Sequence, residues 1–319
     1  MEASRPRGQY HRGTLSRRAF LQVVLAGGSL AALAACGGAA VSSPTSGGAA
    51  GGTLTLGVSN EPETLDPMFA VGVNEYMVDY NVMEGLFTQT NRATERTLVT
   101  NDYALRDAPG QGCCGALHAH AGDADAARRL AKVNVAAFER ADVDHICVNA
   151  AGCGAMMKEY AHLLAHQPEW RERAERVSAK VRDVSELLTA AGGPKHGGGV
   201  KVRVAYDAPC HLVHAQRIAT APIDLLRAIP ELDLVPLNES EMCCGSAGIY
   251  NLVEPETSDV VLARKLENIS AAAPDVVTTG NPGCLMQIGA GLRRGSIATR
   301  AVHPVDLLDR SYEVLDDRC

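Results

Sequence analysis

The chain has 319 residues, which is enough for one large domain or two ordinary domains with a hydrophobic core. It carries 30 basic and 37 acidic side chains, and this net charge of −7, with only 4% aromatic residues, argues against a nucleic-acid-binding surface. Its 10 cysteines are too sparse for a disulfide scaffold, so their clustering is more informative than their number.

Residues 1–36 have the pattern of an export signal. Several arginines precede an apolar run without charge, from Ala19 to Ala35. The sequence SRRAFLQ resembles the twin-arginine export motif, and LAAC resembles a bacterial lipobox, in which the cysteine (here Cys36) is acylated after cleavage. A membrane-spanning anchor would also explain the run, but the run is short for a span and rich in Gly and Ala.

A flexible linker of Gly, Ala and Ser is expected over residues 37–52, before a short strand from Thr53 to Val58. The sequences GGTL, EPETLDP and NVMEGL resemble the start of extracytoplasmic solute-binding proteins of peptide transporters. That family needs several hundred further residues to close around a peptide. The resemblance therefore implies an incomplete solute-binding fragment over residues 53–90.

Residues 91–191 form the first of two predicted cysteine-rich units. A helix, a short strand and the loop QGCCG are followed by an amphipathic helix from Asp123 to Ala141. The sequence DVDHICV then predicts a buried strand that leads into a loop at Gly152-Cys153. A helical region from Met156 to Ala191, broken at Pro168, completes the unit, and residues 192–199 form a glycine-rich linker.

Residues 200–315 form the second unit and follow the same order. One strand ends at Cys210, another ends at a second CCG sequence, and a helix and a third strand lead to Cys284. Cys114 and Cys153 are 39 positions apart, and Cys244 and Cys284 are 40 apart. The sequence therefore predicts an internal duplication: an α/β fold of two Rossmann-like units with parallel strands.

Cysteines at the carboxyl ends of parallel strands are expected to gather at one edge of a sheet. Four thiolates there suit an iron–sulfur cluster. Zinc ribbons also use four thiolates, but their paired C-x2-C spacing is absent. Buried structural thiols or disulfides would also account for clustered cysteines, although adjacent cysteines, about 3.8 Å apart at Cα, rarely bond to each other.

The cysteine spacing C-x32-CCG…NPGC resembles the duplicated CCG domain of heterodisulfide reductase subunits. The sequences GQGCCGALHAHAGD, VNAAGCGAMMKEY, DAPCHLVHAQ and HPVDLL resemble the iron–sulfur subunit of bacterial glycolate oxidase. The resemblance implies an electron-transfer subunit, itself non-catalytic, that accepts electrons from a flavoprotein oxidising glycolate and passes them toward the respiratory chain. The implied iron ligands are Cys210, Cys243, Cys244 and Cys284, which would hold a 4Fe-4S type cluster, and Cys113, Cys114 and Cys153 in the first unit.

Three departures from these families matter. The ferredoxin-like C-x2-C-x2-C-x3-CP segment of glycolate oxidase subunits is absent. The first unit's leading cysteine would fall at Tyr80, so a first-unit cluster would lack a ligand. The heterodisulfide-type motif ends in C-x2-C, but Ala150 and Asn281 stand where its penultimate cysteine would be, which argues against a five-cysteine cluster.

The remaining cysteines and the nearby histidines have simpler interpretations. Cys147 lies within a predicted strand and suits core packing, and Cys319 is a terminal residue. The histidines beside the cysteines are expected to hydrogen-bond within loops rather than to bind iron; they are His118, His120, His211 and His214.

Two hypotheses compete with the electron-transfer subunit. The chain could be a lipid-anchored solute-binding protein of a peptide transporter, or a non-functional chimera that joins two unrelated genes. The two parts of the sequence also imply different locations. The leader implies export and a membrane lipoprotein, whereas the iron–sulfur part implies the cytoplasmic face of the inner membrane.

Overall fold

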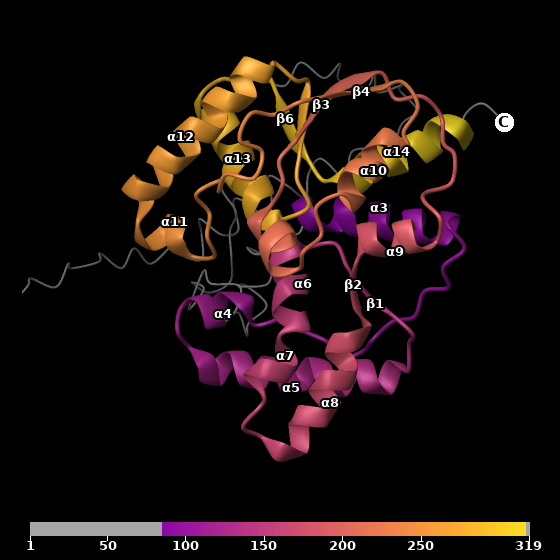
Figure 1. Cartoon of the computed structure of the whole chain (residues 1–319), viewed down its shortest axis with the longest axis vertical. Helices are drawn as coiled ribbons and strands as arrows, with labels where there is room; N and C mark the ends of the chain where they lie inside the picture. Colours follow the sequence, from indigo (N-terminus) through magenta and orange to yellow (C-terminus); the bar gives the residue numbers. More distant parts are fainter. Residues whose placement is uncertain (1–84, 317–319) are drawn as a thin grey trace, which may run out of the picture. The chain divides into compact units, whose positions relative to one another are not determined.

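The computed structural model describes residues 85–316 (Figure 1). The expected leader, its Cys36, the linker, the strand at Thr53–Val58 and the terminal Cys319 lie outside the described residues. The described helices are α3 (Gly85–Thr100), α4 (Ala116–His120), α5 (Ala124–Ala141), α6 (Ala151–Lys158), α7 (Tyr160–Leu163), α8 (Pro168–Lys180), α9 (Val184–Ala190), the π-helix η3 (His211–Ala215), α10 (Ala221–Arg227), α11 (Tyr250–Val253), α12 (Pro255–Ala272), α13 (Pro282–Arg294) and α14 (Pro304–Asp316).

The strands form two parallel sheets. The first pairs β1 (Ile146–Val148) with β2 (Val181–Asp183). The second has the order β4-β3-β5-β6 and consists of β3 (Val202–Tyr206), β4 (Leu232–Val235), β5 (Val276–Thr278) and β6 (Arg300–Val302). Helices connect the strands of both sheets, so the predicted α/β fold with parallel strands is confirmed.

The four-stranded sheet is covered on both faces, which explains its apolar strands. Val204, Ala205 and Val277 are fully buried, as expected for central strands of a parallel sheet. Leu225, Leu226, Leu307 and Leu308 of α10 and α14 pack in one hydrophobic cluster, and Leu262, Ile269, Ile288 and Leu292 of α12 and α13 pack in another. In Figure 1, α12 and α13 lie on one side of this sheet and α10 and α14 on the other.

The helix α5 follows from its sequence. Asp123 caps it by accepting a hydrogen bond from the Ala126 backbone N–H at 3.0 Å. Its buried stripe of Ala131, Val135 and Phe138 packs against β1, β2 and α6 to α8 in a separate core. The helix ends at Ala141, and the next residue, Asp142, adopts a left-handed conformation.

Two predicted elements of the first unit are wrong. No strand lies between residues 101 and 113 of the described chain. The helical region expected from Met156 to Ala191 is interrupted by β2, because Val181 is fully buried beside Ile146 in the parallel pair. Asp183 then accepts a hydrogen bond from the Ser185 N–H and starts α9 with a capping box.

His303 links the end of the chain to the first unit from a fully buried position. Its Nδ1 accepts a hydrogen bond from the Val305 backbone N–H at 3.1 Å, so Nε2 carries the proton that is donated to the Asn149 carbonyl at 2.8 Å. Burial lowers the pKa of His303 to about 4, which keeps the ring neutral near pH 7.

Among the helices that the structure describes, none combines the length and apolar character that crossing a lipid bilayer requires.

The neutral His303 predicts a loss of stability in acid. The unfolded chain binds a proton at this histidine near pH 6.5, whereas the folded chain does so only near pH 4. The free energy of unfolding should therefore fall by on the order of 3 kcal/mol more in the wild type than in His303→Gln between pH 7 and pH 4. Urea denaturation across this range measures the difference. Asp183, whose pKa burial raises to about 6, titrates with the opposite sign in both proteins and cancels. If the free energy of unfolding changed equally with pH in the wild type and His303→Gln, the neutral, buried state of His303 would be contradicted.

Candidate iron–sulfur site

The cysteines of the second unit are brought together by the order of its strands. Cys210 follows β3, Cys243 and Cys244 follow β4, and Cys284 is the third residue of α13, directly after β5. Because β4, β3 and β5 are parallel neighbours, their carboxyl ends meet at the same edge of the sheet. The four thiols, termed the second-unit quartet, therefore arise from three adjacent loops.

The quartet forms a continuous row of sulfur contacts. Cys210 and Cys244 both hydrogen-bond Cys243, and Cys244 also hydrogen-bonds Cys284. The bonds from Cys210 and Cys244 lower the pKa of Cys243, whereas the same contacts raise the pKa of Cys210 and of Cys244. A single thiolate among protonated thiols is what such crowding allows, because several adjacent negative charges need a cation to balance them.

Three predicted ligands of the first unit also gather. Cys113 hydrogen-bonds Cys114, and Cys114 hydrogen-bonds Cys153, whose pKa this contact lowers. Cys153 is the third residue of α6, as Cys284 is of α13. These three thiols, termed the first-unit trio, match three members of the quartet; Tyr80, where the fourth member would be, lies outside the described residues.

The two CCG loops share one backbone conformation. Gly115 and Gly245 have φ angles of 82° and 91°, a left-handed region that favours glycine. Their N–H groups donate to the sulfurs of Cys113 at 3.4 Å and of Cys243 at 3.3 Å. A Cβ atom on Gly245 would stand 2.6 Å from the Ser258 carbonyl oxygen. Glycine is thus required for the left-handed turn that brings this N–H group to the sulfur.

Each CCG loop is held by the eleventh residue of an 18-residue helix. In the first unit this residue is Asn134 of α5, which accepts from the Gly112 N–H at 2.8 Å and donates to the Cys113 carbonyl at 2.9 Å. Tyr160 adds a hydrogen bond from its hydroxyl to the Cys114 carbonyl. All groups in this first-unit anchor are neutral.

The equivalent residue of the second unit is charged. Lys265 of α12 is 0% exposed and donates to the carbonyls of Glu239 and Ser240 at 3.1 and 3.0 Å. It also pairs with the buried carboxylate of Asp207 at 2.7 Å. Burial raises the pKa of Asp207, and the charge of Lys265 opposes this. The ion pair joins the loop before Cys210 to the loop before Cys243.

Lys265, Asp207 and Asn134 were not predicted from the sequence. A signal for Lys265 exists, because it falls on the buried stripe of α12 between Leu262 and Ile269, where an apolar residue is expected. Nothing in the sequence indicates that Asp207 is its partner, since the two are 58 positions apart.

The two cysteine groups flank a contact between the units. The Ala151 and Gly152 N–H groups at the start of α6 donate to the Gly280 carbonyl and to the Asn281 side-chain oxygen, each at 3.0 Å. Gln216, just after η3, donates to the Ala151 carbonyl at 2.8 Å. His120 of α4 stacks edge-on against His211, with ring centroids 5.4 Å apart.

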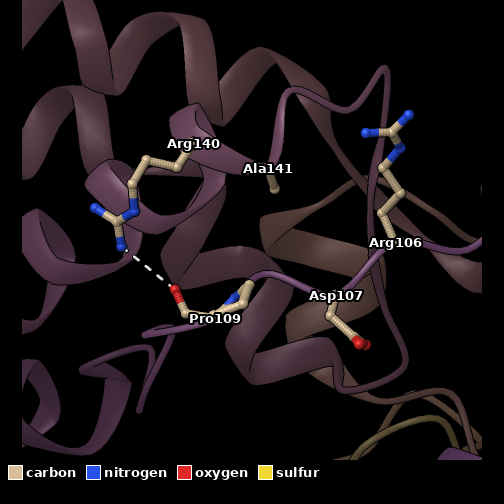
Figure 2. Close-up of a pocket in the computed structure, with 5 residues that line it drawn as sticks. All are labelled: Arg106, Asp107, Pro109, Arg140 and Ala141. Atoms are coloured by element: carbon tan, nitrogen blue, oxygen red, sulfur yellow. Dashed lines mark hydrogen bonds between the residues drawn. The ribbon is translucent and has the colours of Figure 1, made fainter.

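Several further residues lie outside these groups. Cys147 is in β1 beside the core, and burial raises its pKa to about 12, in agreement with a packing role. His211 Nδ1 lies 3.8 Å from the Cys210 sulfur, and burial lowers the His211 pKa. His118 lies 3.7 Å from Asp123, and His214 lies in η3. A surface pocket lined by Arg106, Asp107, Pro109, Arg140 and Ala141 contains no cysteine (Figure 2).

The donor set fits an iron–sulfur cluster better than a single ion. All eight cysteines of residues 85–316 are free thiols, and within this range no three His, Cys, Asp or Glu side chains are arranged to hold one metal ion. In a four-iron cluster the cysteines bind different irons, so they need not converge on one point. A row of four thiols with N–H donors aimed at the sulfurs meets that need.

Comparison with protein families gives a match over both units. The model of the CCG cysteine-rich domain matches residues 76–158 and residues 204–289. Together the two matches cover more than half of the chain and contain all seven cysteines of the quartet and the trio.

Comparison with curated proteins gives related sequences. The chain is 39% identical over 231 residues to the probable glycolate oxidase iron-sulfur subunit of Bacillus subtilis. The aligned region covers 71% of this chain and 52% of that protein. It is 28% identical to the glycolate oxidase iron-sulfur subunit of Escherichia coli, over 72% of this chain and 55% of that protein. It is also 28% identical to lactate utilization protein A of Geobacillus kaustophilus, over 70% of this chain and 93% of that protein. The chain thus spans about half the length of the two glycolate oxidase subunits.

The buried Lys265–Asp207 pair predicts that a single variant loses more free energy of unfolding than the double variant does. Lys265→Met leaves the Asp207 carboxylate buried without its partner and should lower the free energy of unfolding by about 3–5 kcal/mol. Adding Asp207→Asn removes the unpaired charge and should restore part of that loss. Urea denaturation of the iron-free proteins measures both. A double variant as unstable as Lys265→Met would show that the charge pair is not what stabilises these loops.

Proposed function

Because the chain belongs to the family of proteins with CCG cysteine-rich domains, we propose that it is an iron–sulfur electron-transfer subunit of a glycolate-oxidase type complex. The observation that carries the proposal is the second-unit quartet: four free thiols brought by three parallel strands to one edge of a sheet. The relatives named as iron-sulfur subunits support the same interpretation.

The quartet holds one cluster of 4Fe-4S type in this proposal. Cys210, Cys243, Cys244 and Cys284 provide the thiolates, and the cluster, when bound, supplies one-electron redox chemistry. The Gly245 N–H stabilises negative charge on the Cys243 sulfur, and the Lys265–Asp207 pair holds two of the ligand loops in place. The first-unit trio lacks a fourth cysteine and is not proposed to hold a complete cluster.

A flavoprotein is the proposed electron donor. A cluster held by the quartet would carry single electrons, whereas oxidation of a hydroxy acid removes two electrons and needs an acceptor such as a flavin. The substrate would therefore be oxidised on the partner, and this chain would pass the electrons on. The names of the glycolate oxidase relatives support the partner's substrate class.

The iron content of cysteine variants tests the proposal on the full chain, expressed without oxygen. We expect about four iron and four acid-labile sulfide per wild-type chain, with an EPR signal after reduction. Cys284→Ser should lose the iron. Cys147→Ser, which removes a buried thiol outside the quartet, should keep it, and so should Cys153→Ser.

A soluble, folded wild type without iron would overturn the proposal. Iron lost equally from Cys147→Ser and Cys284→Ser would show that binding does not depend on the quartet. Loss from Cys153→Ser with retention in Cys284→Ser would place the iron in the first unit instead.

We further propose that residues 1–36 act as an export leader with Cys36 as the lipid attachment site, and that residues 53–90 derive from a solute-binding protein. The sequences LAAC and EPETLDP support this. The CCG match begins at residue 76, so it overlaps the end of that fragment. Lipidation would anchor the chain to a membrane surface, whereas the iron–sulfur part, with the leader unused, would act at the cytoplasmic face of the inner membrane.

The leader predicts a processed and acylated amino terminus. In a bacterial host, the wild type should incorporate radiolabelled fatty acid and sediment with membranes, because acyl chains at Cys36 add apolar surface that favours the bilayer. Cys36→Ala should do neither. Mass spectrometry that finds intact Met1 in a soluble wild-type chain would show that the leader is not used.

A further inference from the structure

Asn281 stands between the two cysteine groups and bonds to both units. Its side-chain oxygen accepts a hydrogen bond from the Gly152 N–H, one residue before Cys153, at 3.0 Å. Its side-chain nitrogen donates to the Cys284 sulfur at 3.4 Å. The neighbouring bond from the Ala151 N–H to the Gly280 carbonyl, at 3.0 Å, fixes the two backbones beside it.

The orientation of the amide is set by chemistry. A backbone N–H can only donate, so the Asn281 atom that faces Gly152 must be the oxygen. The NH₂ group is then turned toward Cys284, and a flipped amide would lose both contacts. The first unit thus determines which end of Asn281 faces the quartet.

The first unit has no counterpart to this contact. Ala150 occupies the position three before Cys153, as Asn281 does before Cys284, and its side chain cannot donate a hydrogen bond. The remaining N–H···S contact of the CCG loop is the same in both units. The amide donor is therefore a feature of the second unit alone.

We propose that Asn281 raises the reduction potential of the second-unit cluster by donating a hydrogen bond to the Cys284 sulfur, in an orientation fixed by Gly152 of the first unit. The inference rests on the proposed iron–sulfur function. A donor to a ligand sulfur stabilises the reduced state more than the oxidised state, because reduction adds negative charge to the cluster and its sulfurs. Asn281 is a positioning and tuning residue, and it binds no iron.

A redox titration followed by EPR on the full-length chain tests the proposal. Asn281→Ala removes the donor without adding charge and should lower the equilibrium constant for reduction roughly tenfold, which is about 59 mV for a one-electron couple. Asn281→Asp keeps an oxygen for Gly152 but turns a carboxylate oxygen toward the sulfur, so it should lower the potential further. All variants should keep the wild-type iron content.

Gln216→Ala is the matched control. It removes another hydrogen bond between the units, from the Gln216 side chain to the Ala151 carbonyl at 2.8 Å, and touches no ligand cysteine. Its potential should equal that of the wild type. An equal shift in Gln216→Ala and Asn281→Ala would overturn the proposal, because the contact between units in general would then set the potential.

The remaining outcomes are also decisive. An iron-loaded Asn281→Ala protein with an unchanged potential refutes the role of the amide while leaving the proposed function intact. Loss of iron from Asn281→Ala, with the wild type loaded, refutes it too, since the residue would then be needed to build the site. A wild type without iron overturns the proposed function and this inference with it.

Discussion

The parallel pairing of β4, β3 and β5 is the constraint on which the candidate site depends. Strands that run in the same direction end at the same edge, so loops far apart in the sequence meet there. Cys210 and Cys284 are 74 positions apart but follow adjacent strands, β3 and β5. The apolar packing of α10 and α14 on one face and of α12 and α13 on the other holds this register. Adjacent thiols at such an edge repel one another once ionised, so the geometry favours a cationic occupant that neutralises them.

The internal duplication shows how one framework was adapted in two ways. Asn134 and Lys265 occupy the same helix position and hold the same loop, but one is neutral and the other belongs to a buried ion pair. Removing water from a charged pair costs more than burying an amide, so the pair is a costly way to hold a loop. The pair joins the loop before Cys210 to the loop before Cys243. The buried charge pair thus stands where the loops after β3 and β4 are joined.

The sequence predicted what depends on local pattern and failed where distant residues decide. The cysteine loops, α5 and the parallel strands follow from Gly, from apolar periodicity and from the order of elements. The strand β2 was missed because Val181, Arg182 and Asp183 follow a helical pattern, and only the pairing with β1 makes them extended. Lys265 could have been noticed as a charge on an apolar stripe, but its partner Asp207 depends on the packing of α12 against the loop after β3. At position 281 the sequence shows only that asparagine stands where a cysteine would be expected. The hydrogen bonds of Asn281 with Gly152 and Cys284 depend on the packing of the first unit against the second.

The contacts between the units give the first unit a structural role that does not depend on metal binding. Ala151, Gly152 and Asn149 of the first unit each bond to the second, and the buried His303 closes the last of these bonds. Ala151 and Gly152 are the first two residues of α6, which also carries Cys153. These contacts involve no sulfur, so they do not depend on whether the first-unit cysteines bind iron. Loss of the fold around Cys153 would instead remove the support of Asn281 beside Cys284. The first unit therefore supports the loop that carries Cys284, whether or not its own thiols bind iron.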